Sequence, residues 1–107
     1  MEIKELKEFA DWASKRKETL LNKSNCDLIS SDAVKLAEET GEVANEIQNY
    51  LGLQRKEKID SKEIILKHLG EELADVILVS TILARRTGLD IEEAIRNKMD
   101  IVKGRNC

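Results

Sequence analysis

The sequence has no proline, five glycines and few aromatic residues, which account for 3% of its 107 positions. Tight turns depend on proline and glycine, and strands favour aromatic and β-branched side chains, so this composition argues against an all-β fold. It favours long helices joined by few loops. A chain of this length is expected to form one compact domain over residues 1–107.

Three further absences exclude classes of protein and partner. Cys26 and Cys107 suggest neither a disulfide framework nor a Cys-x-x-Cys metal site, so we expect reduced thiols in a cytoplasm. The 18 basic and 21 acidic residues leave a formal charge of -3, which provides no basic field for a nucleic-acid polymer. The longest apolar run, residues 76–84, is far shorter than the ~20 residues of a membrane span, and the N-terminus lacks a signal-peptide core.

The apolar periodicity of the sequence predicts four helices separated by short polar segments. Their expected ranges are about 2–22, 30–51, 61–88 and 90–104. The Ser-Ser-Asp segment 30–32 offers N-caps for the second helix, Asp60 or Ser61 for the third, and Asp90 for the fourth. Gly70 is a candidate bend within the third helix.

Two pairs of carboxylates stand at helical spacing on the second and third helices. Glu39 and Glu42 lie in KLAEETGEVANEI, and Glu72 and Asp75 lie in LGEELADVILVS. Residues three apart occupy neighbouring turns of one helix face, so each helix offers two converging acids. Helical-wheel positions place the first pair at the shoulder of the expected buried face and the second pair within an apolar surface. The apolar residues expected in the buried arc of the second helix are Ala33, Leu36, Ala37, Val43, Ala44, Ile47 and Leu51.

Carboxylates on an apolar face need a compensating partner. An ionised carboxylate costs several kcal/mol to take out of water, unless its pKa is strongly raised. A divalent cation is the simplest partner for four such groups. Oxygen ligands without a cluster of Cys or His favour Mg²⁺, with Mn²⁺ as a substitute and Ca²⁺ next, and disfavour Zn²⁺. Mg²⁺ keeps several waters and reaches substrate phosphates, which indicates phosphoryl chemistry.

The order of these acids resembles that of a known family. The run EETGE at 38–42, followed by Glu72 and Asp75 on the next long helix, is similar to the E-E-x-x-E and E-x-x-D motifs of the MazG-like, all-α nucleoside triphosphate pyrophosphohydrolases. The similarity extends over about residues 9–105. It implies hydrolysis of a nucleoside triphosphate between its α- and β-phosphates, to a monophosphate and pyrophosphate, by an enzyme that removes unwanted or surplus nucleotides.

The resemblance also implies a role for each acid. The implied Mg²⁺ ligands, which would also be catalytic, are Glu39, Glu42, Glu72 and Asp75. Glu38 would orient or activate the attacking water, or complete the metal shell. These roles agree with general chemistry, because a cation neutralises phosphate oxygens and lowers the pKa of a bound water, while a carboxylate takes the proton.

Substrate contacts follow from the same resemblance. The segment IEEAIRNKMDIVKGRN is similar to the family's triphosphate-binding segment, in which Lys98 and Arg105 match and Lys103 is a further candidate. Many members have Asn where this chain has Val102. Trp12 lies where members often place an aromatic residue near the base, and core or interface packing is its alternative. For the basic residues the alternative is favourable charge near a helix C-terminus. The expected substrate is a deoxynucleotide, similar to dCTP or dUTP.

The third helix is apolar on nearly every side, so three short helices of one chain scarcely cover it. We therefore expect an all-α, four-helix-bundle-like protomer that oligomerises through its long central helices, as a dimer or as a tetramer built from two dimers.

Two other functions remain open. A non-enzymatic helical metal-binding or interaction module would carry its acids on an exposed face. A phosphoribosyl-ATP pyrophosphohydrolase-like enzyme would use nearly the same chemistry. His68 is expected at the surface or in a structural role.

Overall fold

The computed structural model describes residues 1–52 and 61–105, and all regular structure in these ranges is helical. The helices are α1 (Ile3–Leu21), α2 (Asn25–Tyr50), α3 (Lys62–Thr87) and α4 (Ile91–Lys103). The prediction of an all-α chain with four helices is confirmed. Among the described helices, none has the length and apolarity needed to cross a bilayer. Most of the segment between the second and third predicted helices, residues 52–60, lies outside the described residues.

The predicted start of the second helix is wrong, because α2 begins at Asn25 and not near residue 30. Ser24 is its N-cap, and the Ser24 hydroxyl accepts a hydrogen bond from the backbone N–H of Asp27 at 3.2 Å. Asp27 also places a negative charge in the first turn, where it stabilises the helix dipole. The polar composition that suggested a loop therefore belongs to a capped first turn.

The predicted caps of the third and fourth helices agree with the structure. The Ser61 hydroxyl accepts a hydrogen bond from the backbone N–H of Ile64 at 3.3 Å, whereas Asp60 lies outside the described residues. The Asp90 carboxylate accepts two backbone N–H groups in the first turn of α4. Between them, α3 is continuous through Gly70 and ends at Gly88, whose positive φ of 75° suits a residue without a side chain.

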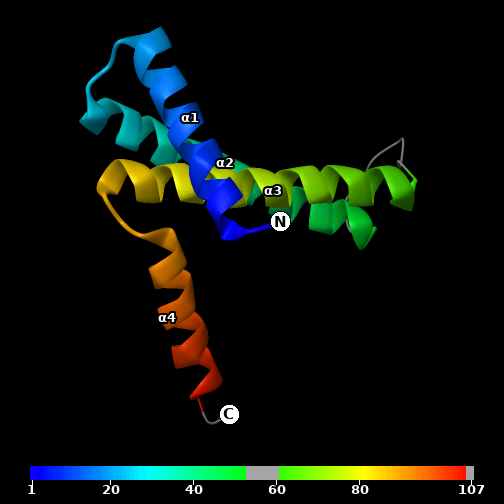
Figure 1. Cartoon of the computed structure of the whole chain (residues 1–107). Coiled ribbons are helices and arrows are strands. Elements are labelled where there is room, and N and C mark those ends of the chain that lie inside the picture. The colour runs from blue at the N-terminus through cyan, green and yellow to red at the C-terminus, as the bar shows by residue number, and fades with distance from the viewer. Residues whose placement is uncertain (53–60, 106–107) are drawn as a thin grey trace.

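α3 is the central helix of the protomer. α2 runs antiparallel along one side of it, and α1 crosses it on another side, as Figure 1 shows. α4 leaves the carboxyl end of α3 and projects away from the other three helices (Figure 1). The radius of gyration is 16.8 Å, against about 13 Å for a compact domain of this length. The protomer is therefore an open arrangement with much uncovered surface.

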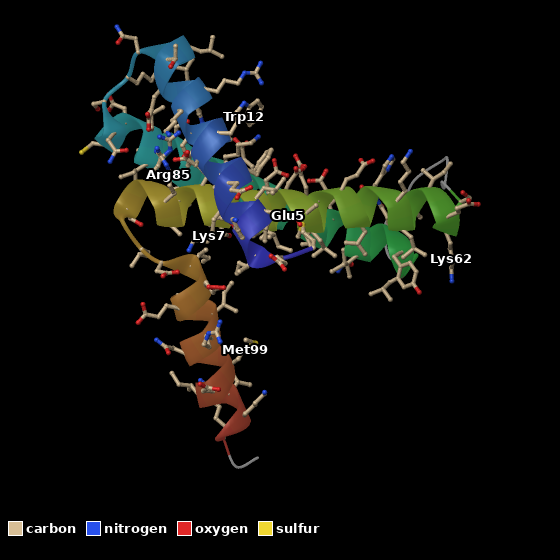
Figure 2. All side chains as sticks on the ribbon, in the orientation of Figure 1. Glu5, Lys7, Trp12, Lys62, Arg85 and Met99 are labelled. Carbon is tan, nitrogen blue, oxygen red and sulfur yellow. The ribbon has the colours of Figure 1, made fainter. Side chains whose placement is uncertain are left out.

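The hydrophobic core of the described residues is small. Its buried members are Ala10, Leu28, Ile65, Val79 and Ala84. Larger apolar side chains remain exposed on several helices, including Met99, which projects from α4 with 51% of its surface accessible (Figure 2). A core of this size stabilises a chain only weakly by itself, so further burial is expected elsewhere.

The buried arc predicted for the second helix is wrong for most of its members. Leu36 and Val43 are half-buried, because the face of α2 that contacts α3 is centred on other residues. The other five are exposed, the last two at 40% and 56%: Ala33, Ala37, Ala44, Ile47 and Leu51. That inner face carries Leu28, Asp32 and Glu39 as its buried positions. The interface between the two helices therefore contains carboxylates, while part of the apolar face of α2 points to solvent.

A network of ion pairs holds α1 against the other two helices. The Arg86 side chain is fully buried, and its Nε lies 2.6 Å from Asp32 Oδ2. Lys17 of α1 binds the other oxygen of Asp32 at 2.8 Å. Glu18 accepts from both Arg86 at 3.3 Å and Arg85 at 3.0 Å, and Figure 2 shows Arg85 beside the crossing of α1 and α3. The sequence pattern alone does not predict this network.

Candidate metal centre

The acids of α2 and α3 meet where the two helices pack side by side. Glu39 of α2 and Glu72 and Asp75 of α3 each offer a carboxylate oxygen, and these oxygens all lie within 4.8 Å of one another. A hard divalent cation binds oxygen ligands at about 2.0–2.6 Å, which keeps them within about 5 Å of each other. The three carboxylates therefore have the spacing of a ligand set.

Burial of these carboxylates makes the cluster costly without a cation. The Glu39 side chain is 8% exposed. Glu39 and Glu72 each leave an oxygen, Oε2, buried and without a hydrogen-bond donor. A buried acceptor without a partner costs desolvation free energy, which a coordinated divalent cation removes. The residues present thus fit a divalent cation bound by oxygen ligands.

The acids also alter one another's protonation. Glu42, and after it Glu39, raise the pKa of Glu72 to about 8, because they hydrogen-bond to its protonated form and repel its ionised form, with burial acting in the same direction. Burial, followed by the charge of Glu39, raises the pKa of Asp75. The pKa of Glu39 is lowered, chiefly because Glu72 donates a hydrogen bond to it. The metal-free cluster therefore retains a proton at neutral pH.

The structure places the two remaining acids of the motif differently. Glu42 is exposed, yet it lies close enough to Glu72 to be the largest cause of its raised pKa. The four acids predicted as metal ligands are thus brought together, with Glu42 at the edge of the compact set. Glu38 is exposed, and within the described ranges it has no ion pair or hydrogen bond with the cluster.

One cation at this site, Lys35, was not among the residues predicted from the sequence. Lys35 stands one helical turn before Glu39, and its Nζ lies 3.3 Å from Glu39 Oε1. The signal for this contact was present in the sequence, since a Lys and a Glu four residues apart face each other on a helix.

The predicted phosphate-binding residues do not reach the acids of their own chain. Lys98, Lys103 and Arg105 are exposed on α4 or directly after it. The carboxyl end of α3 is about 18 Å along the helix from Asp75, at 1.5 Å per residue. α4 begins beyond that end and projects away (Figure 1). Their role in phosphate binding therefore stays a prediction that needs a second copy of the chain.

Trp12 lies on the surface of α1 (Figure 2). Trp12 is 55% exposed. Its ring centroid lies 5.7 Å from that of Phe9, and the Arg16 guanidinium lies 5.4 Å from the Trp12 ring centroid. Core packing of Trp12 within one chain is thus excluded, and contact with a base or with another subunit remains.

His68 is exposed, in agreement with its predicted surface position, and Cys26 is an exposed free thiol.

Two antiparallel helices with a carboxylate set in their interface define an all-α protein with a candidate site for a divalent cation. Residues 30–106 match the model of the MazG nucleotide pyrophosphohydrolase domain. The chain therefore belongs to the MazG nucleotide pyrophosphohydrolase family, as its acidic motifs indicated. The matched region includes all five acids and α4 but not α1. No curated protein and no solved structure matches the chain significantly.

Proposed function

We propose that the chain, as a single MazG-like domain over residues 1–107, is a Mg²⁺-dependent pyrophosphohydrolase that converts a nucleoside triphosphate to the monophosphate and pyrophosphate. The observation that carries this proposal is the set of three carboxylates within 4.8 Å, between two helices of the matched family region. A helical interaction module would carry its acids on an exposed face. The burial of Glu39, at 8% exposure, favours the enzyme.

In this proposal, Glu39, Glu72 and Asp75 hold the cation, and Glu42 completes the set from its edge. A divalent cation bound there supplies neutralising charge to phosphate oxygens and acidifies a coordinated water. Glu38 has a separate task as the carboxylate that orients the attacking water and accepts its proton. Its exposure suits this task, because a base must meet a water from bulk solvent.

Substrate binding in the proposal requires a second copy of the chain. The partner's α4 would supply the triphosphate contacts of Lys98, Lys103 and Arg105, since α4 projects away from the acids of its own protomer. Trp12 would contact the base or a neighbouring subunit. The substrate would be a deoxynucleotide, and the role would be removal of unwanted nucleotides from the cytoplasmic pool.

The outer face of α3 supports a homo-oligomer. α1 covers this face near the carboxyl end of α3, where Ala10 of α1 and Ala84 of α3 line a common crevice. Nearer the amino end, Leu66, Leu73 and Ile77 are between 46% and 52% exposed. Their spacing of seven and four residues puts them on one stripe of the helix. A second copy that packs along this stripe would form the proposed dimer, and two dimers would form the tetramer.

The test is pyrophosphate release from a panel of canonical and modified nucleoside triphosphates and phosphoribosyl-ATP, with Mg²⁺, Mn²⁺ or EDTA. We expect a monophosphate and pyrophosphate in equal amounts, only with a divalent cation. The ranking of the panel would identify the base and separate a general nucleotide hydrolase from a phosphoribosyl-ATP-like enzyme. No turnover of any compound, with Mg²⁺ nevertheless bound, would replace the enzyme with a metal-binding interaction module.

A further inference from the structure

Lys35 occupies a special position among the cations of the described residues. Of the ion pairs within residues 1–52 and 61–105, that of Lys35 with Glu39 alone involves a carboxylate of the metal cluster. The Lys35 side chain is 54% exposed, whereas its partner is 8% exposed. Its ammonium group therefore stands where a buried carboxylate opens to solvent.

The contact with Lys35 engages only one of the two carboxylate oxygens of Glu39. Lys35 binds Oε1 of Glu39, while Oε2 of the same carboxylate is buried without a donor. The charge of Lys35 also opposes the rise in the pKa of Asp75, which places it within electrostatic range of a second acid of the set. Lys35 thus neutralises part of the cluster from one side without filling its centre.

We infer that Lys35 is a phosphate-binding residue of this site and balances the charge of Glu39 until a substrate is bound. The inference rests on the proposed function, because the phosphates of a nucleoside triphosphate are the anions that would reach the cluster. Once the carboxylates hold a divalent cation, the charge of Glu39 is engaged and the ammonium is free to turn toward a phosphate oxygen. A Lys side chain suits this exchange, since it carries a point charge on a flexible four-carbon stem.

The exchange costs the fold little. The ammonium group of Lys35 is half-exposed, and a bound divalent cation would balance the charge of the buried Glu39 carboxylate when Lys35 turns away. The loss of the ion pair on substrate binding is then small against a charge-assisted bond to phosphate. Lys35 differs from other lysines in such pairs because its partner, Glu39, belongs to the metal cluster. Lys4 forms the same type of pair with Glu8, at 3.9 Å, on α1, and Glu8 is not a member of the carboxylate cluster.

The test compares Lys35→Met, which keeps most of the stem and removes the charge, with Lys35→Arg and with Lys4→Met as the matched control. Isothermal titration calorimetry first measures Mn²⁺ binding to the metal-free proteins. We expect Lys35→Met to bind Mn²⁺ about 3- to 10-fold more tightly, because a neighbouring positive charge no longer competes for Glu39. Lys4→Met should bind Mn²⁺ as the wild type does.

The second titration uses the Mg²⁺ complex of inorganic tripolyphosphate at saturating Mg²⁺. We expect Lys35→Met to bind it about 10-fold or more weakly, because a charge-assisted hydrogen bond is lost, and Lys35→Arg to remain close to the wild type. A higher affinity for Mn²⁺ together with a lower affinity for tripolyphosphate in Lys35→Met is the result that the inferred role predicts. A general loss of folding would weaken both.

Unchanged tripolyphosphate affinity in Lys35→Met, an equal loss in Lys4→Met, or no binding to the wild type would each overturn the inference. The proposed function fails by a different result. If the wild type hydrolyses no nucleoside triphosphate while Lys35→Met alone loses tripolyphosphate affinity, the enzyme assignment falls and the phosphate-binding role of Lys35 stands. If hydrolysis is found and Lys35→Met keeps the wild-type KM and tripolyphosphate affinity, the enzyme assignment stands and the phosphate-binding role of Lys35 falls.

Discussion

At the scale of single residues, Glu72 shows how neighbours change the chemistry of a carboxyl group. Glu42 and Glu39, together with burial, raise its pKa from 4.5 to about 8. The unfolded chain loses this proton near pH 4.5, whereas the folded, metal-free protein keeps it to about pH 8. Between these two values the folded state binds more protons, so the stability of the metal-free fold falls as the pH rises.

The same raised pKa predicts proton release on metal binding. At pH 7 a Mg²⁺ ion should displace about one proton from the cluster, because the cation takes the place of the proton on Glu72. Isothermal titration calorimetry in buffers with different ionisation enthalpies measures this number. At pH 9, where Glu72 is already ionised, the number of protons released should approach zero and the affinity for Mg²⁺ should be higher. Binding at pH 7 without proton release would contradict the raised pKa.

Substitution of the acids tests their role as ligands. Glu39→Gln and Asp75→Asn should each lower turnover by about two orders of magnitude or more, since a ligand to the cation is lost. Helicity should be retained and the metal-free melting temperature unchanged or raised, because each substitution removes a charge from a crowded cluster. Glu71→Gln is the control, as Glu71 is an exposed acid beside Glu72. Wild-type turnover in the two ligand variants would remove the metal assignment.

At this scale the sequence was informative wherever a residue's role depends on helical spacing. The pairing of Glu39 with Glu42 and of Glu72 with Asp75 needed only the helical repeat, and their convergence needed only two adjacent helices. The direction of each pKa shift could not be predicted, because it depends on which carboxylate faces which neighbour after packing. Lys35 was missed since its spacing alone describes an ordinary surface pair.

At the scale of helices, the attachment of α1 depends on charge more than on apolar contact. Asp32 is the centre of this attachment, because it binds both Lys17 and the fully buried Arg86. Asp32→Ala should destabilise the fold by about 3 kcal/mol or more, since it leaves a buried guanidinium short of a partner. The melting temperature should fall by about 10 °C or more.

Two further variants make this prediction specific. Glu8→Ala removes an exposed ion pair on α1 and should change stability by less than about 1 kcal/mol. A paired replacement of Asp32 and Arg86 by Leu and Met should recover much of the lost stability, because no buried charge is left unpaired. Thermal melts followed by circular dichroism check all three. Equal melting temperatures for Asp32→Ala and Glu8→Ala would show that the network does not hold α1.

Helix boundaries and buried faces were predicted unevenly, for an identifiable reason. Caps at Ser61 and Asp90 follow from local hydrogen bonding and were found in the sequence. The start of α2 was misplaced because a polar, capped first turn has the composition of a loop. Ile47 and Leu51 were assigned to a buried face, yet hydrophobic periodicity marks a face to be covered without saying which chain covers it.

At the scale of the whole molecule, the open shape of the protomer connects its stability to its proposed activity. A radius of gyration of 16.8 Å and an α4 without a buried residue leave apolar surface that one chain cannot cover. The same openness keeps α4, which carries Lys98, apart from the helices that hold the acids of the same chain (Figure 1). Packing between copies would therefore bury the surface and complete the site together, which is why sequence could predict the basic residues of α4 but not their distance from the acids.

This connection predicts that one substitution on α3 affects assembly and turnover together. The wild type should elute with twice or four times the mass of one chain in size-exclusion chromatography with light scattering. Leu73→Glu puts a charge into the exposed stripe of α3 and should shift the protein to monomer, with loss of most turnover, because α4 of a partner is no longer held near the cluster. Leu20→Glu is the control, since Leu20 is 69% exposed near the end of α1 and its substitution should preserve mass and turnover. A monomeric wild type with full turnover, or a Leu73→Glu protein of unchanged mass, would show that a single protomer carries the whole site or that another face joins the copies.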